Sequence, residues 1–209
     1  MKNKGLKKRI IEISYKHKLS HLGSCLTAVD IIKEIFDQKK PDEKFVLSSG
    51  HAGVALYVVL EQKGGRNAEE IFLHHGVHPD RCSDCGIDCS TGSLGQGLPI
   101  AVGMALADRK KDVYCLISDG ECAEGSIWEA LTIKDKYEIS NLRIYCNVNG
   151  WGAYDPIDKS KLLSKLMFFD RDIKIIDTDS NVFGFLRDQE SHYYTMNEKD
   201  YEQAISLLS

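Results

Sequence analysis

Short apolar runs and longer amphipathic segments alternate along this chain, which predicts buried strands interleaved with helices. Residues 113–117 and 142–146 are almost entirely apolar and too short for helices, as expected of strands buried in a parallel sheet. An amphipathic helix fits between them. Residues 173–176 predict a further strand, and residues 45–47 predict a short strand or a turn.

Helical periodicity marks further segments, and capping residues mark several of their ends. Helices are expected at residues 6–18, 28–37, 50–63, 68–75, 97 to about 110 and 159–169, with a last one ending near residue 208. Thr27 is the expected N-cap of the second helix, with Asp30 completing an imperfect capping box. Gly76 is expected to end the helix at 68–75, and Asn197 to cap the last helix.

This alternation predicts the α/β class: a three-layer sandwich of helices on a mostly parallel sheet, with residues 1–209 forming a single domain. In the helix that begins near residue 97, small residues are expected to allow close packing on the sheet: Ala101, Gly103, Ala105 and Ala107. Residues 177–195 show no clear pattern.

Composition narrows the function classes. Of the 209 residues, 43% are hydrophobic and 28% charged, near the averages of globular proteins. The formal net charge of −4 and the lack of a Lys/Arg stripe argue against a nucleic-acid partner. No apolar run approaches the roughly 20 residues that span a bilayer, and the basic start lacks the apolar stretch of a signal peptide. We therefore expect a cytoplasmic protein that binds neither nucleic acid nor a membrane.

The seven cysteines fall into two groups, and their odd number argues against a disulfide framework. One group lies in or beside predicted helices and strands, where free thiols behave as small buried hydrophobes: Cys25, Cys115, Cys122 and Cys146. The other is a C-x2-C-x3-C cluster, Cys82, Cys85 and Cys89, for which His78 or Cys122 could complete a zinc site. The alternative is that these three are incidental loop thiols.

Polar groups follow both central predicted strands. Asp119 and Gly120 come directly after the first strand, and Asn149 closely follows the second. Because the carboxyl ends of parallel strands meet at one edge of a sheet, we expect Asp119 and Asn149 to lie together. Hard oxygen ligands beside a glycine turn and a helix N-terminus suit Mg²⁺ or Ca²⁺ bridging to a diphosphate. Taken singly, each residue has a simpler interpretation: Asp119 as a helix N-cap and Asn149 as a turn residue.

Five ordered motifs extend this interpretation. They are His21-Leu-Gly-Ser, Phe45-Val-Leu-Ser-Ser-Gly-His51-Ala, His78-Pro-Asp-Arg81, Ser90-Thr-Gly-Ser-Leu-Gly-Gln-Gly97 and Ser118-Asp-Gly-Glu-Cys-Ala-Glu-Gly125. Over residues 21–155 the chain resembles the amino-terminal, diphosphate-binding half of transketolases, in particular the split forms made of two polypeptides. The resemblance implies a thiamine diphosphate-binding domain of the diphosphate-binding (PP) type, with Mg²⁺ or Ca²⁺ as its ion.

The resemblance also implies roles for individual residues. Asp119, Asn149 and the backbone carbonyl of Trp151 correspond to the protein ligands of the divalent ion. Further cofactor-binding positions are Gly92, Ser93, Leu94, Gly120, Glu121 and Glu124. The loop around Gly92 corresponds to the one that receives the aminopyrimidine. Glu124 corresponds to a carboxylate at the interface between subunits, the alternative being an ordinary acid in the first turn of a helix.

Four of the histidines match family positions. His21 and His78 correspond to catalytic histidines that hydrogen-bond substrate oxygens and shuttle protons. His51 corresponds to a diphosphate contact, and His192, in a looser register, to a further histidine that reaches the diphosphate. The histidines that match nothing are expected at the surface: His17, His74 and His75.

The chain also departs from the family pattern. Ser118 replaces a glycine and Leu22 replaces a proline, both tolerable changes. The segment from Asp155 to His192 is shorter than in the family, which implies that a supersecondary unit after about residue 155 is missing or compressed.

Taken together, the resemblance implies the N-terminal subunit of a thiamine diphosphate- and Mg-dependent transketolase-like transferase. Such an enzyme moves a two-carbon ketol unit from a ketose to an aldehyde acceptor, here a sugar or an activated sugar. No segment resembles a pyrimidine-binding domain, so we expect a C-terminal transketolase-like partner subunit, in an α2β2 assembly. The alternatives are a decarboxylating acyloin synthase similar to deoxyxylulose-phosphate synthase, or a non-catalytic cofactor-binding subunit.

Overall fold

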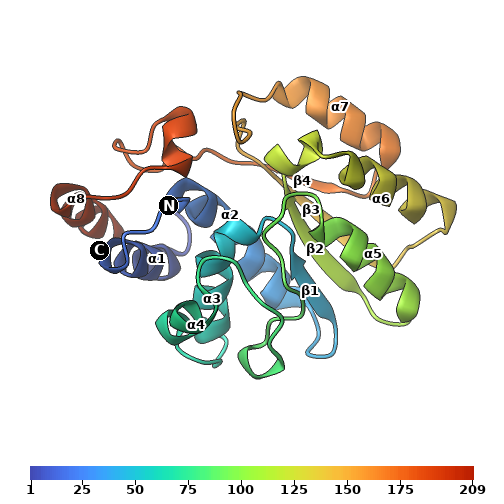
Figure 1. The fold of residues 1–209 in the computed structure, drawn as a ribbon, viewed down its shortest axis with the longest axis horizontal. Helices are drawn as coiled ribbons and strands as arrows, with labels where there is room; N and C mark the ends of the chain where they lie inside the picture. The colour runs from blue at the N-terminus through green and yellow to red at the C-terminus, as the bar shows by residue number, and fades with distance from the viewer.

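A four-stranded parallel sheet forms the centre of the computed structural model, which describes residues 1–209 apart from the side chain of Glu190. Its order is β1 (Lys44–Leu47), β2 (Val113–Ser118), β3 (Leu142–Val148) and β4 (Lys174–Asp177). The sheet aligns Ser118 with Asn147, so β2 and β3 end side by side at their carboxyl ends (Figure 1).

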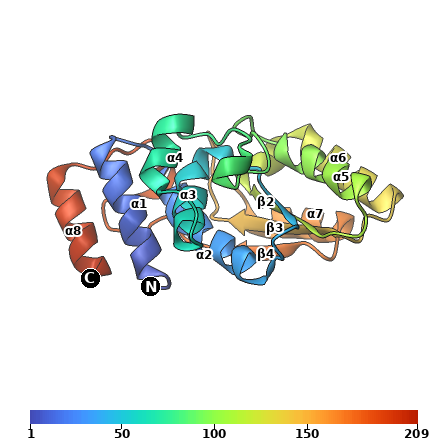
Figure 2. The same ribbon diagram turned by 90° about the horizontal axis from the view of Figure 1, so that it is seen from below.

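Helices cover both faces of this sheet (Figures 1 and 2). One layer is α2 (Leu22–Gln38) and α3 (Gly53–Gln62), with α1 (Lys4–Lys16) packed on these two helices, and the other is α5 (Gly97–Ala107), α6 (Gly125–Lys136) and α7 (Lys159–Phe169). The smaller α4 (Ala68–His75) packs on α3, and α8 (Glu198–Leu208) packs on α1. The predicted three-layer α/β sandwich is therefore confirmed.

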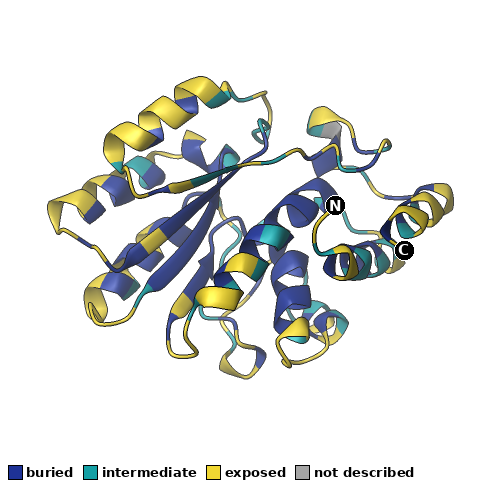
Figure 3. Cartoon of the chain, turned by 180° about the vertical axis from the view of Figure 1, so that it is seen from behind, coloured by how far each residue is buried: buried dark blue, intermediate teal, exposed yellow. Residues whose placement is uncertain are grey.

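Successive side chains of a strand point to opposite faces of the sheet, so the apolar core has two parts, one on each side of the sheet. Leu116 of β2 contributes to the core beneath α1–α3, whereas its neighbour Ile117 contributes to the core beneath α5–α7. Figure 3 shows the result: the strands are mostly buried and the outer faces of the helices are exposed. No helix in the described part of the chain is long and apolar enough to cross a membrane.

The predicted start of the second helix is wrong. The helix begins at Leu22 rather than near residue 28, and Thr27 lies inside it, donating to the carbonyls of Gly23 and Ser24 (both 3.1 Å). Asp30 accepts from Lys7 at 2.6 Å instead of forming a capping box. A tertiary contact accompanies this start. The N-cap residue, His21, makes no side-chain capping bond, and its N–H donates instead to the carbonyl of His192.

Two of the four small residues expected to face the sheet do not. Ala101 and Ala105 are buried against it, whereas Gly103 and Ala107 are exposed on the outer face of α5. α5 also ends at Ala107, a few residues earlier than predicted. By contrast, Gly76 ends α4, and Asn197 forms a capping box with Asp200 at the start of α8, as predicted.

The segment after residue 155 supplies α7 and the edge strand β4 and then crosses back over the molecule. β4 pairs in parallel with β3, and a short helical turn, η4 (Asp188–His192), follows. α8 then packs on α1, where Tyr15 and Tyr201 stack with ring centroids 4.3 Å apart. This return path brings residue 192 to the N-terminus of α2, at the same edge of the sheet as the ends of β2 and β3 (Figure 1).

Candidate functional site

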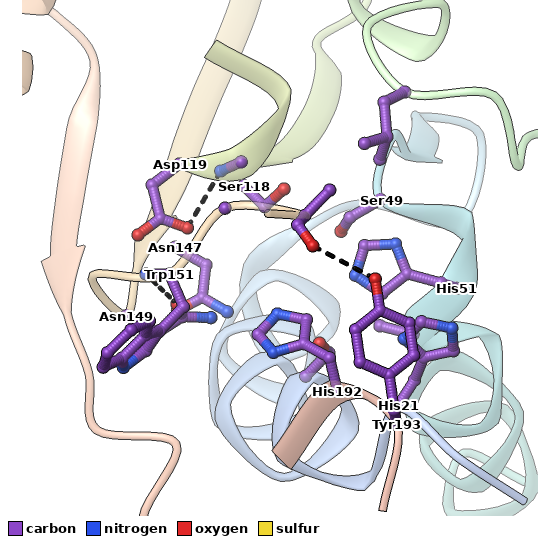
Figure 4. Close-up of a pocket in the computed structure, with 16 residues that line it drawn as sticks. His21, Ser49, His51, Ser118, Asp119, Asn147, Asn149, Trp151, His192 and Tyr193 are labelled. Carbon is purple, nitrogen blue, oxygen red and sulfur yellow. Dashed lines mark hydrogen bonds between the residues drawn. The ribbon is translucent and has the colours of Figure 1, made fainter. Parts of the chain in front are cut away.

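A pocket opens at the carboxyl ends of β2 and β3, where the return segment meets the start of α2 (Figure 4). Polar side chains from five separate parts of the chain line it. The lining includes His21, Ser24, Ser49, His51, Leu94, Ser118, Asp119, Gly120, Asn147, Asn149, Trp151, His192 and Tyr193. Eight of the residues proposed from the sequence are thus brought together in one cavity: His21, His51, Leu94, Asp119, Gly120, Asn149, Trp151 and His192.

Asp119 is a buried carboxylate without a cationic partner. It is only 2% exposed, and its oxygens accept hydrogen bonds from the backbone N–H groups of Gly120 (3.0 Å) and Gly150 (2.6 Å). No described Lys, Arg or His side chain forms an ion pair with it. Burial raises the pKa of its carboxyl to about 6, despite these N–H donors. Each carboxylate oxygen keeps a free lone pair, so the group is suited to a cation.

Asn149 and Trp151 stand beside this carboxylate on the turn after β3. The Asn149 side-chain oxygen accepts from the Trp151 N–H at 2.9 Å, which fixes the amide in place. A bridge between Trp151 and Pro156 closes the turn. A Cβ placed on Gly120 would lie 3.6 Å from the Trp151 carbonyl oxygen, so this carbonyl faces the Asp119–Gly120 turn. Carboxylate, amide and carbonyl oxygens therefore converge there, a donor set typical of Mg²⁺ and Ca²⁺.

Histidines form the opposite wall of the pocket. The rings of His21 and His51 have centroids 5.1 Å apart, and the His192 ring is 6.4 Å from that of His21. The His21 N–H donates to the His192 carbonyl at 2.8 Å, and His21 adopts a left-handed conformation with φ 58°. Such a conformation is uncommon for a residue other than glycine, and it is typical of functional sites.

These histidines are neutral in the pocket. Burial, then the charges of the neighbouring histidines, lowers the pKa of His51 to about 3 and also lowers the pKa of His21. Burial lowers the pKa of His192 as well. The Nδ1 atoms of His21 and His192 and the Ser24 hydroxyl are buried without a hydrogen-bond partner among the described residues. Unpartnered buried polar atoms that line a cavity favour a polar ligand.

His78 and the glycine-rich loop lie next to the pocket rather than in its lining. His78 is exposed, and a Cβ on Gly92 would lie 3.1 Å from the His78 ring, so the loop passes directly against it. Thr91 holds this loop: its hydroxyl donates to the Leu47 carbonyl at 2.7 Å, and its N–H donates to the Pro79 carbonyl at 3.0 Å. Of the predicted loop residues, only Leu94 enters the pocket lining.

Glu121, predicted as a cofactor contact, lies outside the pocket lining. It is fully buried, and its carboxylate accepts from the Ser48 hydroxyl (2.6 Å), the Gly95 N–H (2.9 Å) and the Ser118 N–H (3.0 Å). Burial raises the pKa of this carboxyl. Glu121 is therefore a positioning residue that joins the segment before His51 to the end of β2.

Glu124 is exposed at the start of α6 and also lies outside the pocket lining. A Cβ on Gly95 would lie 2.6 Å from the Glu124 Cβ, and Gly95 has a φ of 79°. The glycine loop and the start of α6 are thus packed tightly together, which only glycine permits at residue 95.

Sequence reasoning missed several pocket residues. Asn147 accepts from the Thr178 hydroxyl at 2.6 Å and donates to Thr27 at 2.9 Å, which ties β3 to the return segment and to α2. Tyr193 donates from its hydroxyl to the Ala153 carbonyl at 3.1 Å. Asn147 was detectable as a buried polar residue at the end of an apolar strand. Tyr193 carried no local signal.

The cysteine predictions are corrected in part. Cys25, Cys115, Cys122 and Cys146 are buried, as expected. In the C-x2-C-x3-C cluster, however, Cys89 points away from the other two, and neither His78 nor Cys122 joins them. His75, expected at the surface, has a side chain only 4% exposed and lies with Cys82 and Cys85. A side chain at the end of α4 reaches the turn at 82–85 only through tertiary packing, which no local pattern predicts.

Comparisons with known proteins place the chain in a family. Residues 10–151 match the family model described as "Transketolase, thiamine diphosphate binding domain". The chain is 35% identical to the transketolase of Pongo abelii over 156 residues, covering 65% of this chain and 25% of that protein. It is 38% identical to one of the subunits of the apulose-4-phosphate transketolase of Phocaeicola vulgatus, covering 65% of this chain and 55% of that protein. The chain thus spans about a quarter to about half of these relatives.

Solved structures show the same fold. A transketolase from Leishmania mexicana superposes with a TM-score of 0.70 at 18% identity, covering 98% of this chain and 40% of that chain. A transketolase variant from Pichia stipitis superposes with a TM-score of 0.76, also at 18% identity, covering 99% of this chain and 40% of that chain.

Proposed function

The chain belongs to the family of transketolase thiamine diphosphate-binding domains, and from that premise we propose that it is one subunit of a thiamine diphosphate- and Mg²⁺-dependent transferase. The reaction is transfer of a two-carbon ketol unit from a ketose to an aldehyde acceptor. The observation that carries this proposal is the pocket itself, in which a buried carboxylate without a cation faces neutral histidines with unpartnered nitrogens.

The residues present fit the divalent ion. Asp119, Asn149 and the Trp151 carbonyl would hold it, with phosphate oxygens completing the shell. A raised pKa of about 6 at Asp119 is what burial produces when no cation is nearby, and a divalent ion would reverse that shift. Gly120 lines the same pocket, and its backbone N–H would approach a phosphate bound there.

The histidine wall fits the anionic and polar parts of the ligands. When bound, the cofactor supplies the electron sink that permits carbon–carbon bond cleavage. His51 would bind the diphosphate, and an anion there would raise the pKa that burial now lowers. His21 and His78 would hydrogen-bond substrate oxygens and move protons to and from them, while His192 orients His21 through its backbone carbonyl.

A second polypeptide is part of the proposal. No segment of the described chain resembles a pyrimidine-binding domain. Leu94 lines the pocket, and the exposed Glu124 packs beside the same loop at Gly95, where a partner subunit would reach it. One relative, from Phocaeicola vulgatus, is named as a single subunit of a transketolase, which supports a division of the enzyme between two polypeptides. We therefore propose a C-terminal transketolase-like partner, in an α2β2 assembly, and a sugar or sugar-phosphate substrate.

The test begins with capture of the tagged chain from the cells that produce it, with mass spectrometry of proteins that co-elute in stoichiometric amount. The purified complex is then assayed for ketol transfer with and without thiamine diphosphate and Mg²⁺. Transfer that requires both is the expected result. Failure of the complex to bind thiamine diphosphate in the presence of Mg²⁺ would contradict the proposal.

The same assay separates the alternatives. Release of CO₂ from a 2-oxo acid, in place of ketol transfer, would identify a decarboxylating acyloin synthase. Cofactor binding without turnover of any ketose or 2-oxo acid would identify a non-catalytic subunit.

A further inference from the structure

His75, Cys82 and Cys85 form a compact group of metal-binding side chains away from the pocket. The two sulfur atoms of Cys82 and Cys85 are 2.6 Å apart, and His75 Nε2 is 3.4 Å from the Cys85 sulfur. Two thiolates about 2.3 Å from one tetrahedral ion stand about 3.8 Å apart, so a bound ion would spread these sulfurs. The ligand atoms of the three residues all lie within 4.8 Å of one another. The group joins two elements, because His75 ends α4, whereas Cys82 immediately precedes and Cys85 ends the short helical turn η2 (Ser83–Cys85).

The backbone of this turn holds both sulfurs on one side. Cys82 and Ile87 exchange N–H···O hydrogen bonds of 2.9 Å in both directions, and Gly86 has a left-handed φ of 76° that lets the chain reverse. A Cβ at Gly86 would lie 3.2 Å from Leu60, so the turn also packs tightly on α3. This is a rigid C-x2-C turn with the ligand spacing found in structural zinc sites.

The histidine is oriented as a metal ligand is. Its Nε2 faces the cysteines, whereas its Nδ1 lies 4.0 Å from the exposed Asp80 carboxylate, beyond hydrogen-bond distance. The His75 side chain is 4% exposed, so the geometry is set by packing and not by chance contact at the surface.

We propose that His75 Nε2, Cys82 Sγ and Cys85 Sγ bind a soft divalent cation of the zinc class, with water in the fourth position. Thiolate and imidazole ligands select such ions over Mg²⁺ and Ca²⁺. The bound ion would cross-link residues 75 and 85 and so close the loop that carries His78. It would also steady the Pro79 carbonyl that holds the glycine loop through Thr91. The site does not depend on the proposed function, because none of its ligands lines the pocket.

The chain provides its own control. Cys89 belongs to the same C-x2-C-x3-C motif, but its thiol donates to the Ser90 carbonyl at 3.3 Å and packs into the core beneath α5–α7. A metal site that used all three cysteines of the motif would lose its ion when Cys89 is replaced, whereas the site proposed here would keep it.

The experiment measures the zinc content of the full chain by elemental mass spectrometry. The protein is purified with a reductant and without thiamine diphosphate. We expect about one zinc ion per chain in the wild type and in Cys89→Ser, and about a tenth of that or less in Cys82→Ser and Cys85→Ser. Replacement with Co²⁺ should give thiolate-to-cobalt absorption in the wild type.

Three results would overturn the proposal. Zinc content could be the same in the wild type and in the Cys82→Ser/Cys85→Ser double variant. It could be lost equally in Cys89→Ser, or the reduced wild type could bind Co²⁺ without thiolate absorption. Circular dichroism of each metal-free variant separates loss of ligands from loss of fold, and His75→Gln supplies a variant that leaves the cysteine turn intact. These results are independent of thiamine diphosphate binding.

Discussion

The two walls of the pocket are held in different ways. On the strand-end wall, backbone N–H groups hold both side chains. Asp119 accepts from its neighbour Gly120 and from Gly150 at the end of the next strand, and Asn149 accepts from Trp151, two residues later. On the histidine wall, His21, His51 and His192 come from distant parts of the sequence, and only the bond from the His21 N–H to the His192 carbonyl links two of them. The strand-end wall is therefore preorganised by local structure, whereas the histidine wall depends on the return of the chain from β4.

The two walls also differ in the direction in which burial shifts the pKa values of their side chains. Burial raises the pKa of Asp119, which disfavours its charge until a cation arrives. Burial lowers the pKa of the histidines, which leaves neutral rings with unpartnered nitrogens. A cation on one wall and an anion on the other would satisfy both, and a metal-bound diphosphate has this polarity.

The largest effect is expected on the strand-end wall. Asp119→Ala, measured in the complex with the partner subunit, should weaken Mg²⁺-dependent thiamine diphosphate binding by at least about a hundredfold, more than is typical for residues that only support ligands. Asp112→Ala is the matched control, because Asp112 pairs with Arg143 at the opposite end of β2. Calorimetry provides the measurement. Unchanged affinity in Asp119→Ala would remove the metal assignment.

Beside the histidine wall, His78→Ala should lower kcat while leaving the cofactor affinity nearly unchanged. A proton-transferring group typically contributes about 10²–10⁴-fold to turnover. His17→Ala is the control, since His17 pairs with Glu69 far from the pocket. Steady-state kinetics and cofactor titration on the same preparations give the two quantities. Turnover equal to that of the wild type would show that His78 has no catalytic part.

Glu121 connects the two walls, and its removal should affect both. Glu121→Ala leaves the Ser48 hydroxyl and the N–H groups of Gly95 and Ser118 without their acceptor, which we expect to cost about 3 kcal/mol of unfolding free energy. The exposed Glu124, changed to alanine, should shift stability by no more than about 0.5 kcal/mol. Urea denaturation of the isolated chain measures both. Equal stability of the two variants would refute the positioning role.

The last prediction concerns pH and the cation-free carboxylate. Because the pKa of Asp119 is raised to about 6 in the folded chain, its folded form binds a proton more tightly than its unfolded form does. Asp119 should therefore contribute a loss of up to about 3 kcal/mol of stability as the pH rises from about 4 to about 7, opposed over the same range by the histidines whose pKa values burial lowers. The stability difference between the wild type and Asp119→Asn should therefore change with pH across this window, whereas the difference between the wild type and Asp112→Asn should not. A slope unchanged in Asp119→Asn would show that another group titrates.

Local sequence patterns predicted much of the fold and one wall of the site. The apolar runs at β2 and β3 identified buried parallel strands, and the polar residues after them correctly placed Asp119 beside Asn149. The caps at Asn197 and Gly76 were likewise readable, because each involves residues within one helical turn. The motif histidines His21 and His51 reached the pocket, but through a resemblance and not through periodicity.

Tertiary structure decided the rest. α2 begins at Leu22 because a carbonyl at His192 fixes the residue before it. Glu121 turned inward because hydroxyl and N–H donors from two other segments satisfy a carboxylate buried there.

The position of His75 is a further example, away from the pocket. There the end of α4 packs against the turn that carries Cys85, ten residues later in the chain. Strand ends and helix caps depend on residues that are neighbours in the chain, and so they can be predicted from the sequence by itself. Groups that meet across the fold are set by how whole elements pack, because packing brings together residues whose separation along the chain carries no signal.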